Sequence, residues 1–213
     1  MDTVWIDQMI HITSSKGAFR HSQIAFQAVT ALSRADAMGL LPLEERIESL
    51  DVPALRSVLR HMHKAGIGRS LDAAVNGEYA DPPALAHLLE QLNAALEESP
   101  VPEYEWDRLS GILGVELLAE LVGVSAISLR RYRTAARSTP DRIAGRLHAL
   151  AMIVGDLAGA YNDMGVRQWF RRKRVQLGGR APSELLAGQW DPRDPGPVQV
   201  RELARALTAA PAA

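Results

Sequence analysis

The stretch that most constrains this chain lies near its middle, where two short helical patterns flank a glycine. The first pattern places apolar residues on one face of an amphipathic helix: Leu117, Leu118, Leu121 and Val122. Gly123 can take the positive φ that ends this helix, and Ser125 can cap the next one. Small Ala119 permits a close helix crossing, while Val124 and Leu129 can close a small core between the two helices. The stretch predicts a helix-turn-helix.

The second helix of this motif, residues 126–133, is basic, and so is the chain around it. Residues 106–180 contain thirteen Lys/Arg and six Asp/Glu, a net charge of +7. The remaining residues contain eleven Lys/Arg and nineteen Asp/Glu, a net charge of −8, so the total of −1 conceals a strong division. A basic segment that coincides with a helix-turn-helix indicates contact with the phosphates of double-stranded DNA.

We expect small and basic residues around the second helix to contact DNA: Ser125, Ala126, Ser128, Arg130, Arg131, Arg133 and Arg137. The arginines suit phosphates, and with Arg142 and Arg146 they could form one strip along the motif and the following helix. Base reading is poorer, because Ala126 and Ile127 can touch a thymine methyl group but cannot make bidentate hydrogen bonds. The sequence therefore predicts weak sequence preference and salt-dependent affinity. The alternative, a merely solvated basic face, stays open.

Residues 1–105 predict an entirely helical region, because their apolar positions recur every three or four residues. The expected helices cover residues 4–12, 22–38, 43–50, 52–66 and 81–97. Prolines near residue 100 mark the preferred boundary, so we divide this all-α chain into residues 1–102, a helix-turn-helix at 103–140 and a C-terminal region at 141–208. Self-association, holding a partner and a purely structural role are the roles considered for residues 1–102.

Downstream of the motif, Thr139 as cap and Pro140 in the first position predict the start of a long helix that ends at 162–165. Its buried seam is expected to comprise Ile143, Leu147, Leu150, Val154, Leu157 and Tyr161. Its glycines can admit a neighbouring backbone: Gly145, Gly155 and Gly159. A helix at 166–174 with Trp169 and Phe170 in the core, a glycine turn, a short helix from Pro182 and a last helix around 200–207 complete the prediction.

Several function classes are excluded or disfavoured. The chain has no cysteine, which excludes disulfides, thiolate zinc sites and cysteine nucleophiles. Its six histidines are scattered, and His61 and His63 point to different sides of a helix, so we expect no metal site. No G-x-S-x-G, H-E-x-x-H or glycine-rich phosphate motif occurs, so we expect no enzyme and no cofactor. A basic leader is missing and Asp156 interrupts the longest apolar run, which predicts a cytoplasmic protein without a membrane partner.

Residues 106–207 resemble antitoxins with an Xre-like helix-turn-helix and an MbcA/ParS-type toxin-binding domain. The resemblance rests on residues 118–125 (LAELVGVS), 129–132 (LRRY), 146–147 (RL), 165–170 (GVRQWF) and 177–186 (LGGRAPSELL). It implies an all-helical protein that neutralises a RES-domain toxin, an NAD-consuming enzyme, by placing its C-terminal region against the toxin's active site. Many relatives also bind their own promoter. This chain departs from them at residues 174–176, where many have Asn-Pro, and in its long N-terminal region.

The resemblance places the partner-binding surface in the C-terminal signature and the basic residue beside it: Trp169, Arg172, Leu177, Gly178, Gly179, Arg180, Pro182 and Leu185. Two alternatives stay open: a stand-alone helix-turn-helix repressor without a toxin, and a protein-binding module that does not bind DNA. A palindromic operator would require a homodimer, for which the sequence names no surface.

Overall fold

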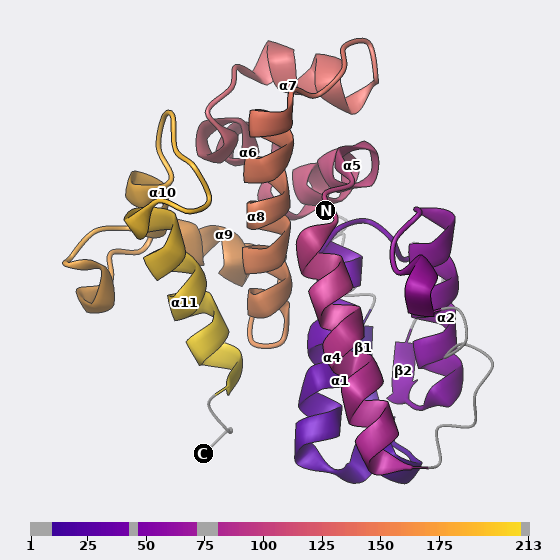
Figure 1. Ribbon diagram of the computed structural model, residues 1–213. Helices are drawn as coiled ribbons and strands as arrows, with labels where there is room; N and C mark the ends of the chain where they lie inside the picture. Colours follow the sequence, from indigo (N-terminus) through magenta and orange to yellow (C-terminus); the bar gives the residue numbers. More distant parts are fainter. Residues whose placement is uncertain (1–9, 43–46, 72–80, 210–213) are drawn as a thin grey trace, which may run out of the picture.

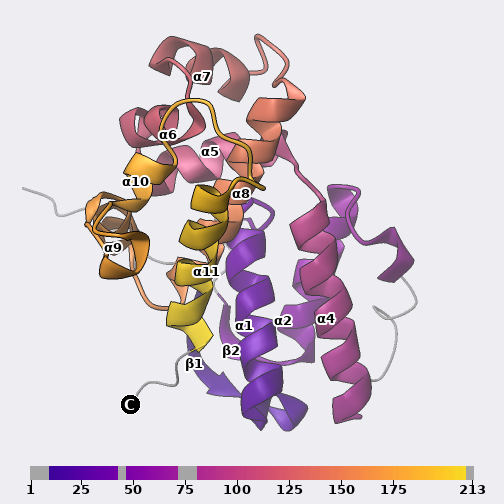
Figure 2. The same cartoon turned by 60° about the vertical axis from the view of Figure 1, so that its left-hand side comes forward.

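The computed structural model describes residues 10–42, 47–71 and 81–209, and helices form most of these residues (Figure 1). Helix α8 (Asp141–Ala158) runs through the middle of the molecule. The N-terminal helices lie on one side of it and the C-terminal helices on the other, while the helix-turn-helix caps one end (Figure 2). The predicted all-α class is confirmed as the predominant architecture.

Three N-terminal helices are confirmed close to their predicted bounds. They are α1 (Ser22–Ala37), α2 (Val52–Lys64) and α4 (Pro82–Glu98). The Asp51 side chain accepts a hydrogen bond of 3.1 Å from the Ala54 amide and so caps α2. Two short 3₁₀ helices, η1 (Gly17–Arg20) and η2 (Arg69–Leu71), lie in the connections.

Two strands correct the prediction that residues 1–105 are entirely helical. β1 (Ile10–Ser15) and β2 (Ile47–Leu50) pair in parallel where the ends of two helices were expected. The other parts of those predicted helices, 4–9 and 43–46, lie outside the described residues. The prediction failed because each strand is short, and parallel strands pair only across a long connection, here one that contains α1.

The C-terminal half contains a continuous series of short and long helices around α8. In chain order these are α5 (Pro102–Leu113), α6 (Val115–Val122), α7 (Ala126–Arg133), α8, α9 (Asp163–Arg171), η3 (Val175–Leu177), α10 (Pro182–Leu185) and α11 (Pro195–Ala209). The core predictions for the α8 seam hold at Leu147, Leu150, Val154 and Leu157, which are buried. Ile143 and Tyr161 are only half-buried, and Tyr161 lies beyond the helix end.

The predicted helix boundaries in this half need four corrections. Pro140, not Thr139, is the cap of α8, and the Thr139 hydroxyl instead accepts a 2.9 Å hydrogen bond from the Trp106 indole. α8 ends at Ala158, before the predicted stop. α9 begins earlier than predicted because the Asn162 side chain caps it through the Gly165 amide at 2.9 Å. α11 begins at Pro195, several residues before the last helix predicted around 200–207.

The N-terminal and C-terminal parts meet at a close crossing of α1 and α8. Gly155 of α8 lies so near α1 that an added Cβ would stand 2.8 Å from the Arg34 Cα. Nothing lies within 4 Å of a Cβ added at Gly145 of the same helix. The expectation of close approach therefore holds for Gly155 and fails for Gly145.

A cluster of charges lies across this crossing and ties four helices together. Arg34 of α1 is buried and donates a hydrogen bond of 2.9 Å to Asp156 of α8. The Glu97 carboxylate of α4 forms ion pairs with the guanidinium groups of Arg201 and Arg205 of α11, at N···O distances of 2.7 and 2.8 Å. Burial raises the pKa of Asp156, while the arginine cations, despite the opposing effect of partial burial, hold the pKa of Glu97 below its usual value. The cluster links α1 and α4 to α8 and α11.

Candidate nucleic-acid interface

The geometry of the helix-turn-helix is as the sequence predicts. Gly123 ends α6 with φ 75° and ψ 42°, and an added Cβ there would collide with the Gly188 carbonyl oxygen. The Ser125 hydroxyl accepts a hydrogen bond of 3.1 Å from the Ser128 amide and caps α7. Leu129 of α7 is buried. Backbone conformation, cap and core therefore all specify the turn between the two helices.

An aromatic stack holds α7 in place. The Tyr132 ring lies parallel to the Trp106 ring of α5, with 5.7 Å between centroids and 16° between planes. Trp106 is almost completely buried, and its indole nitrogen is hydrogen-bonded to Thr139. Since one face of α7 is packed on α5 in this way, the opposite face must point to solvent.

The predicted arginines lie on the outer face of α7 and in the segment just after it. Arg130, Arg131, Arg133 and Arg137 are all exposed. Arg133 lies 3.3 Å from Asp107, and the Arg137 guanidinium stacks 5.6 Å from the centroid of the Tyr132 ring. Among the described residues, the side chains of Arg130 and Arg131 form no ion pair with an acid and donate no hydrogen bond. These two are therefore the cations of α7 most available for a phosphate.

The other predicted contact residues of the motif are less accessible. Ser125 is exposed, but its hydroxyl already accepts the capping hydrogen bond from the Ser128 amide and donates one to the Ser128 hydroxyl. Ala126 and Ser128 are half-buried, whereas Ile127 is 63% exposed. The side chain that projects furthest from the start of α7 is therefore apolar and suited to a thymine methyl group, not to hydrogen bonding with a base.

Arg146 corrects the expectation of a continuous basic strip. It is completely buried, and its guanidinium donates to the Trp190 carbonyl at 2.6 Å, the Val122 carbonyl at 3.1 Å and the Gln189 side chain at 3.0 Å. Burial lowers the pKa of Arg146. Only Arg142 of the two downstream arginines is exposed. Arg146 is a structural residue that satisfies a carbonyl at the C-terminal end of α6, and the basic strip stops at Arg142.

Trp190 completes this joint, and no sequence pattern had pointed to it. Its indole nitrogen donates 2.8 Å to the Leu121 carbonyl, and the Arg146 guanidinium lies 5.7 Å from the centroid of its ring. Two carbonyls at the C-terminal end of α6, those of Leu121 and Val122, thus receive side-chain donors. The loop before α11 therefore holds the helix-turn-helix against α8.

The predicted partner-binding residues divide into a core and a surface. Trp169, Leu177 and Pro182 are buried, and the Arg174 guanidinium stacks 5.4 Å from the centroid of the Trp169 ring. Leu185 is half-buried. The exposed residues are Arg172, Gly178, Gly179 and Arg180, with Arg171 and Lys173 beside them. We call these six residues the basic turn surface.

Backbone hydrogen bonds shape the glycine turn under this surface. Gly178 and Gly179 have φ of 65° and 76°, conformations that residues with a Cβ rarely adopt. The Arg174 amide donates 3.0 Å to the Arg180 carbonyl, and the Gly179 amide donates 2.9 Å to the Arg174 carbonyl. The buried residues of the signature therefore support the turn, and only its exposed residues can touch a partner in this conformation.

No protein-family model, curated protein or solved structure matches this chain. The family resemblance therefore rests on the sequence motifs alone. Within residues 10–42, 47–71 and 81–209, no group of three or more His, Asp or Glu could hold a metal ion. Across the same residues, no single helix is both long and apolar enough to cross a membrane.

Proposed function

We propose that this protein binds double-stranded DNA through α7 and acts as a regulator of transcription. The observation that carries the proposal is the outward face of α7, where Arg130 and Arg131 are exposed and have no ion-pair partner within the described part of the chain, on a capped, firmly packed second helix. A helix-turn-helix presents its second helix to the major groove, with cations near the phosphates. The net charge of +7 on residues 106–180 favours the same ligand.

The expected binding is strong in its salt dependence and weak in its base preference. Ile127 offers an apolar contact, while Ala126 and Ser128 are half-buried and add little hydrogen bonding. Phosphate contacts would then supply most of the affinity, and each adds about 0.9 to the slope of log K against log salt. Arg133 contributes less than its neighbours, because Asp107 already offsets part of its charge.

The double substitution Arg130→Ala with Arg131→Ala is expected to weaken binding to every duplex sequence. Loss of two phosphate contacts corresponds to roughly a 10- to 60-fold lower affinity at 100 mM salt and a salt slope smaller by about 2. Fluorescence anisotropy with a labelled duplex over a salt series measures both quantities.

The matched control removes two exposed cations from a helix elsewhere, by Arg60→Ala with Lys64→Ala on α2. It changes the net charge equally and should leave affinity and slope nearly unchanged. If the two double variants behave alike, non-specific charge and not α7 determines binding. If the unaltered protein binds no duplex even at low salt, the DNA-binding proposal is wrong.

The basic turn surface supports a second candidate function, the binding of a protein partner. It presents Arg172 and Arg180 around an exposed glycine turn, on a base made rigid by buried Trp169 and Leu177. The class of partner suggested by the resemblance is a RES-domain toxin that consumes NAD. A rigid basic surface suits an acidic site on such a partner.

Co-expression with a RES-domain toxin encoded beside this protein is expected to restore growth that the toxin alone arrests. Arg172→Ala with Arg180→Ala should abolish the rescue and lower DNA affinity much less than Arg130→Ala with Arg131→Ala does, because neither residue lies on α7. Arg130→Ala with Arg131→Ala should do the reverse. DNA binding without rescue would favour a stand-alone repressor, and rescue without DNA binding would favour a DNA-independent module.

A further inference from the structure

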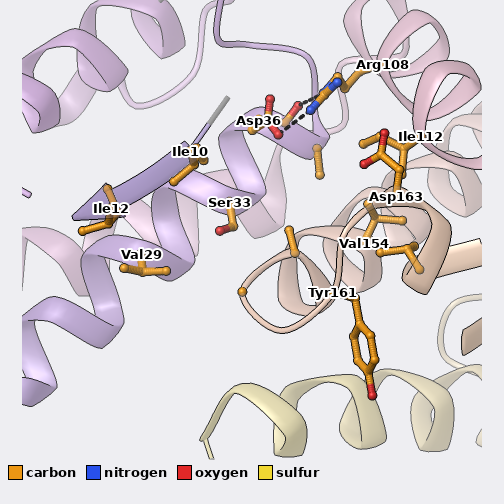
Figure 3. A pocket seen from close by; sticks show the side chains of 14 residues that line it. Ile10, Ile12, Val29, Ser33, Asp36, Arg108, Ile112, Val154, Tyr161 and Asp163 are labelled. Atoms are coloured by element: carbon orange, nitrogen blue, oxygen red, sulfur yellow. Dashed lines mark hydrogen bonds and ion pairs between the residues drawn. The ribbon is translucent and has the colours of Figure 1, made fainter. Parts of the chain in front are cut away.

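A cavity of about 240 Å³ lies between the N-terminal sheet and the helices of the C-terminal half (Figure 3). Its walls come from β1, α1, α5, α8 and α9. Apolar side chains form much of the wall: Ile10, Ile12, Val29, Ile112, Val154 and Val166. The volume is slightly below that of ordinary ligand pockets, which suits a compact molecule.

One end of this cavity carries two carboxylates and one guanidinium. Asp36 is buried, with 7% of its surface exposed, and its Oδ2 accepts a 2.7 Å hydrogen bond from Arg108. Its other oxygen, Oδ1, is buried without a hydrogen-bond partner among the described residues. Such an oxygen costs free energy unless a donor reaches it. This oxygen has almost no accessible surface, so Asp36 acts on the cavity mainly through the negative charge of its carboxylate.

Asp163 is the second carboxylate, and Figure 3 shows it beside Ile112, close to the pair formed by Asp36 and Arg108. It is half-buried, and within the described part of the chain its carboxylate has neither an ion pair nor a hydrogen bond. Burial raises the pKa of Asp163, the negative charge of Asp36 adds to this rise, and Arg108 and Arg167 oppose it. The charge of Asp163 is therefore only partly balanced.

The remaining cation near this end is occupied elsewhere. Arg167 does not line the cavity and donates to the Ile112 carbonyl at 2.6 Å and the Gly111 carbonyl at 2.8 Å. The side chains that line the cavity therefore carry a net charge of −1, from two carboxylates and Arg108. α1 and α8 also end here, at Ala37 and Ala158, and helix C-termini carry partial negative charge.

We propose that this cavity binds a small organic cation, a primary ammonium group carried on a compact aliphatic or alicyclic body. The ammonium group can donate to the Asp163 carboxylate, and the negative charge of Asp36 on the same wall adds to the attraction. The body would lie against Ile112, Val154 and the neighbouring apolar wall. The site is separate from α7, so the proposal does not depend on DNA binding.

Cyclohexylamine is a suitable probe, with cyclohexanol and cyclohexanecarboxylate as neutral and anionic molecules of similar shape. In calorimetric titrations of the full chain at neutral pH, we expect saturable binding of the amine. The alcohol should bind at least about tenfold more weakly, because a charge-assisted hydrogen bond is stronger than a neutral one. The carboxylate should not bind. Absence of amine binding, or equal affinity for the alcohol, would overturn the proposal.

Asp163→Asn keeps the shape of the side chain and removes its charge, so it should lower amine affinity about tenfold or more. Asp141→Asn is the matched control, because Asp141 is an exposed acid in the first turn of α8, outside this cavity. It should leave amine affinity unchanged. Ala158→Leu tests the cavity by filling it, and should abolish binding in a protein that circular dichroism shows to be folded. Amine binding unaffected by either Asp163→Asn or Ala158→Leu contradicts the assignment.

Discussion

Replacing Arg146 by methionine is expected to lower the free energy of unfolding by about 3 kcal/mol. The side chain is completely buried, and its loss leaves the Val122 and Trp190 carbonyls without their donors. Each buried acceptor left unsatisfied costs about 1–3 kcal/mol. Methionine carries no charge, so the variant no longer buries a cation, and this gain offsets part of that cost. Urea unfolding followed by circular dichroism measures the difference.

Two controls separate this hydrogen-bonding role from charge and from helix position. Arg142→Met lies one turn earlier on α8 at an exposed position, and should change stability by no more than about 0.5 kcal/mol. Arg146→Lys retains the charge but lacks the planar guanidinium that reaches several acceptors. Its loss of unfolding free energy should therefore lie between those of Arg146→Met and Arg142→Met. If Arg146→Met were no more harmful than Arg142→Met, the proposed joint between α6, α8 and the loop at 188–190 would not contribute to stability.

The helix-turn-helix could be predicted in detail because its determinants are local. Gly123 needs a positive φ, and Ser125 caps the helix that directly follows it. Both effects act over a few residues and are visible in any sequence. The buried leucines of α4 were equally predictable. An apolar stripe with helical periodicity identifies the buried face of a helix even when the elements that cover it are not known.

The sheet and the buried charges could not be predicted in this way because their partners are distant in sequence. β1 pairs with β2 across a connection that contains α1, and neither short strand has a clear pattern of its own. From the sequence alone, Arg146 cannot be distinguished from a surface cation. Only the fold shows that it lies beside Trp190 and Gly188. Asp156 was a usable signal, since a lone acid within an apolar run indicates a buried partner, but only the fold shows that the partner is Arg34.

The candidate sites show the same difference between features set by nearby residues and features set by residues distant in sequence. The exposure of Arg130 and Arg131 follows from helix geometry once Leu129 and Tyr132 are taken as the buried face. The cavity with Asp36 and Asp163 was missed, because its walls come from five elements and neither acid belongs to a motif. The burial of Trp169 assigns the C-terminal signature largely to folding and leaves the basic turn surface as the part open to contact.

Gly155→Ala is expected to destabilise the protein by about 1–3 kcal/mol, even though alanine favours a helix over glycine by about 1 kcal/mol. The new Cβ would lie 2.8 Å from the Cα and 2.9 Å from the Cγ of Arg34, and backbone atoms cannot move aside as a flexible side chain can. Arg34 is also held by Asp156 at 2.9 Å, so α1 and α8 must separate and weaken the charge cluster. Urea unfolding of the variant measures this loss.

Gly145→Ala provides the matched comparison, because it makes the same chemical change in the same helix where nothing lies within 4 Å of the added Cβ. Helix propensity then acts alone, and the variant should gain up to about 1 kcal/mol. The two substitutions should therefore differ by about 1–4 kcal/mol, a gap that reports the close crossing itself, since propensity cancels between them. Equal stabilities would mean that α1 and α8 do not approach so closely in solution, and that the N-terminal part packs more loosely against the C-terminal half.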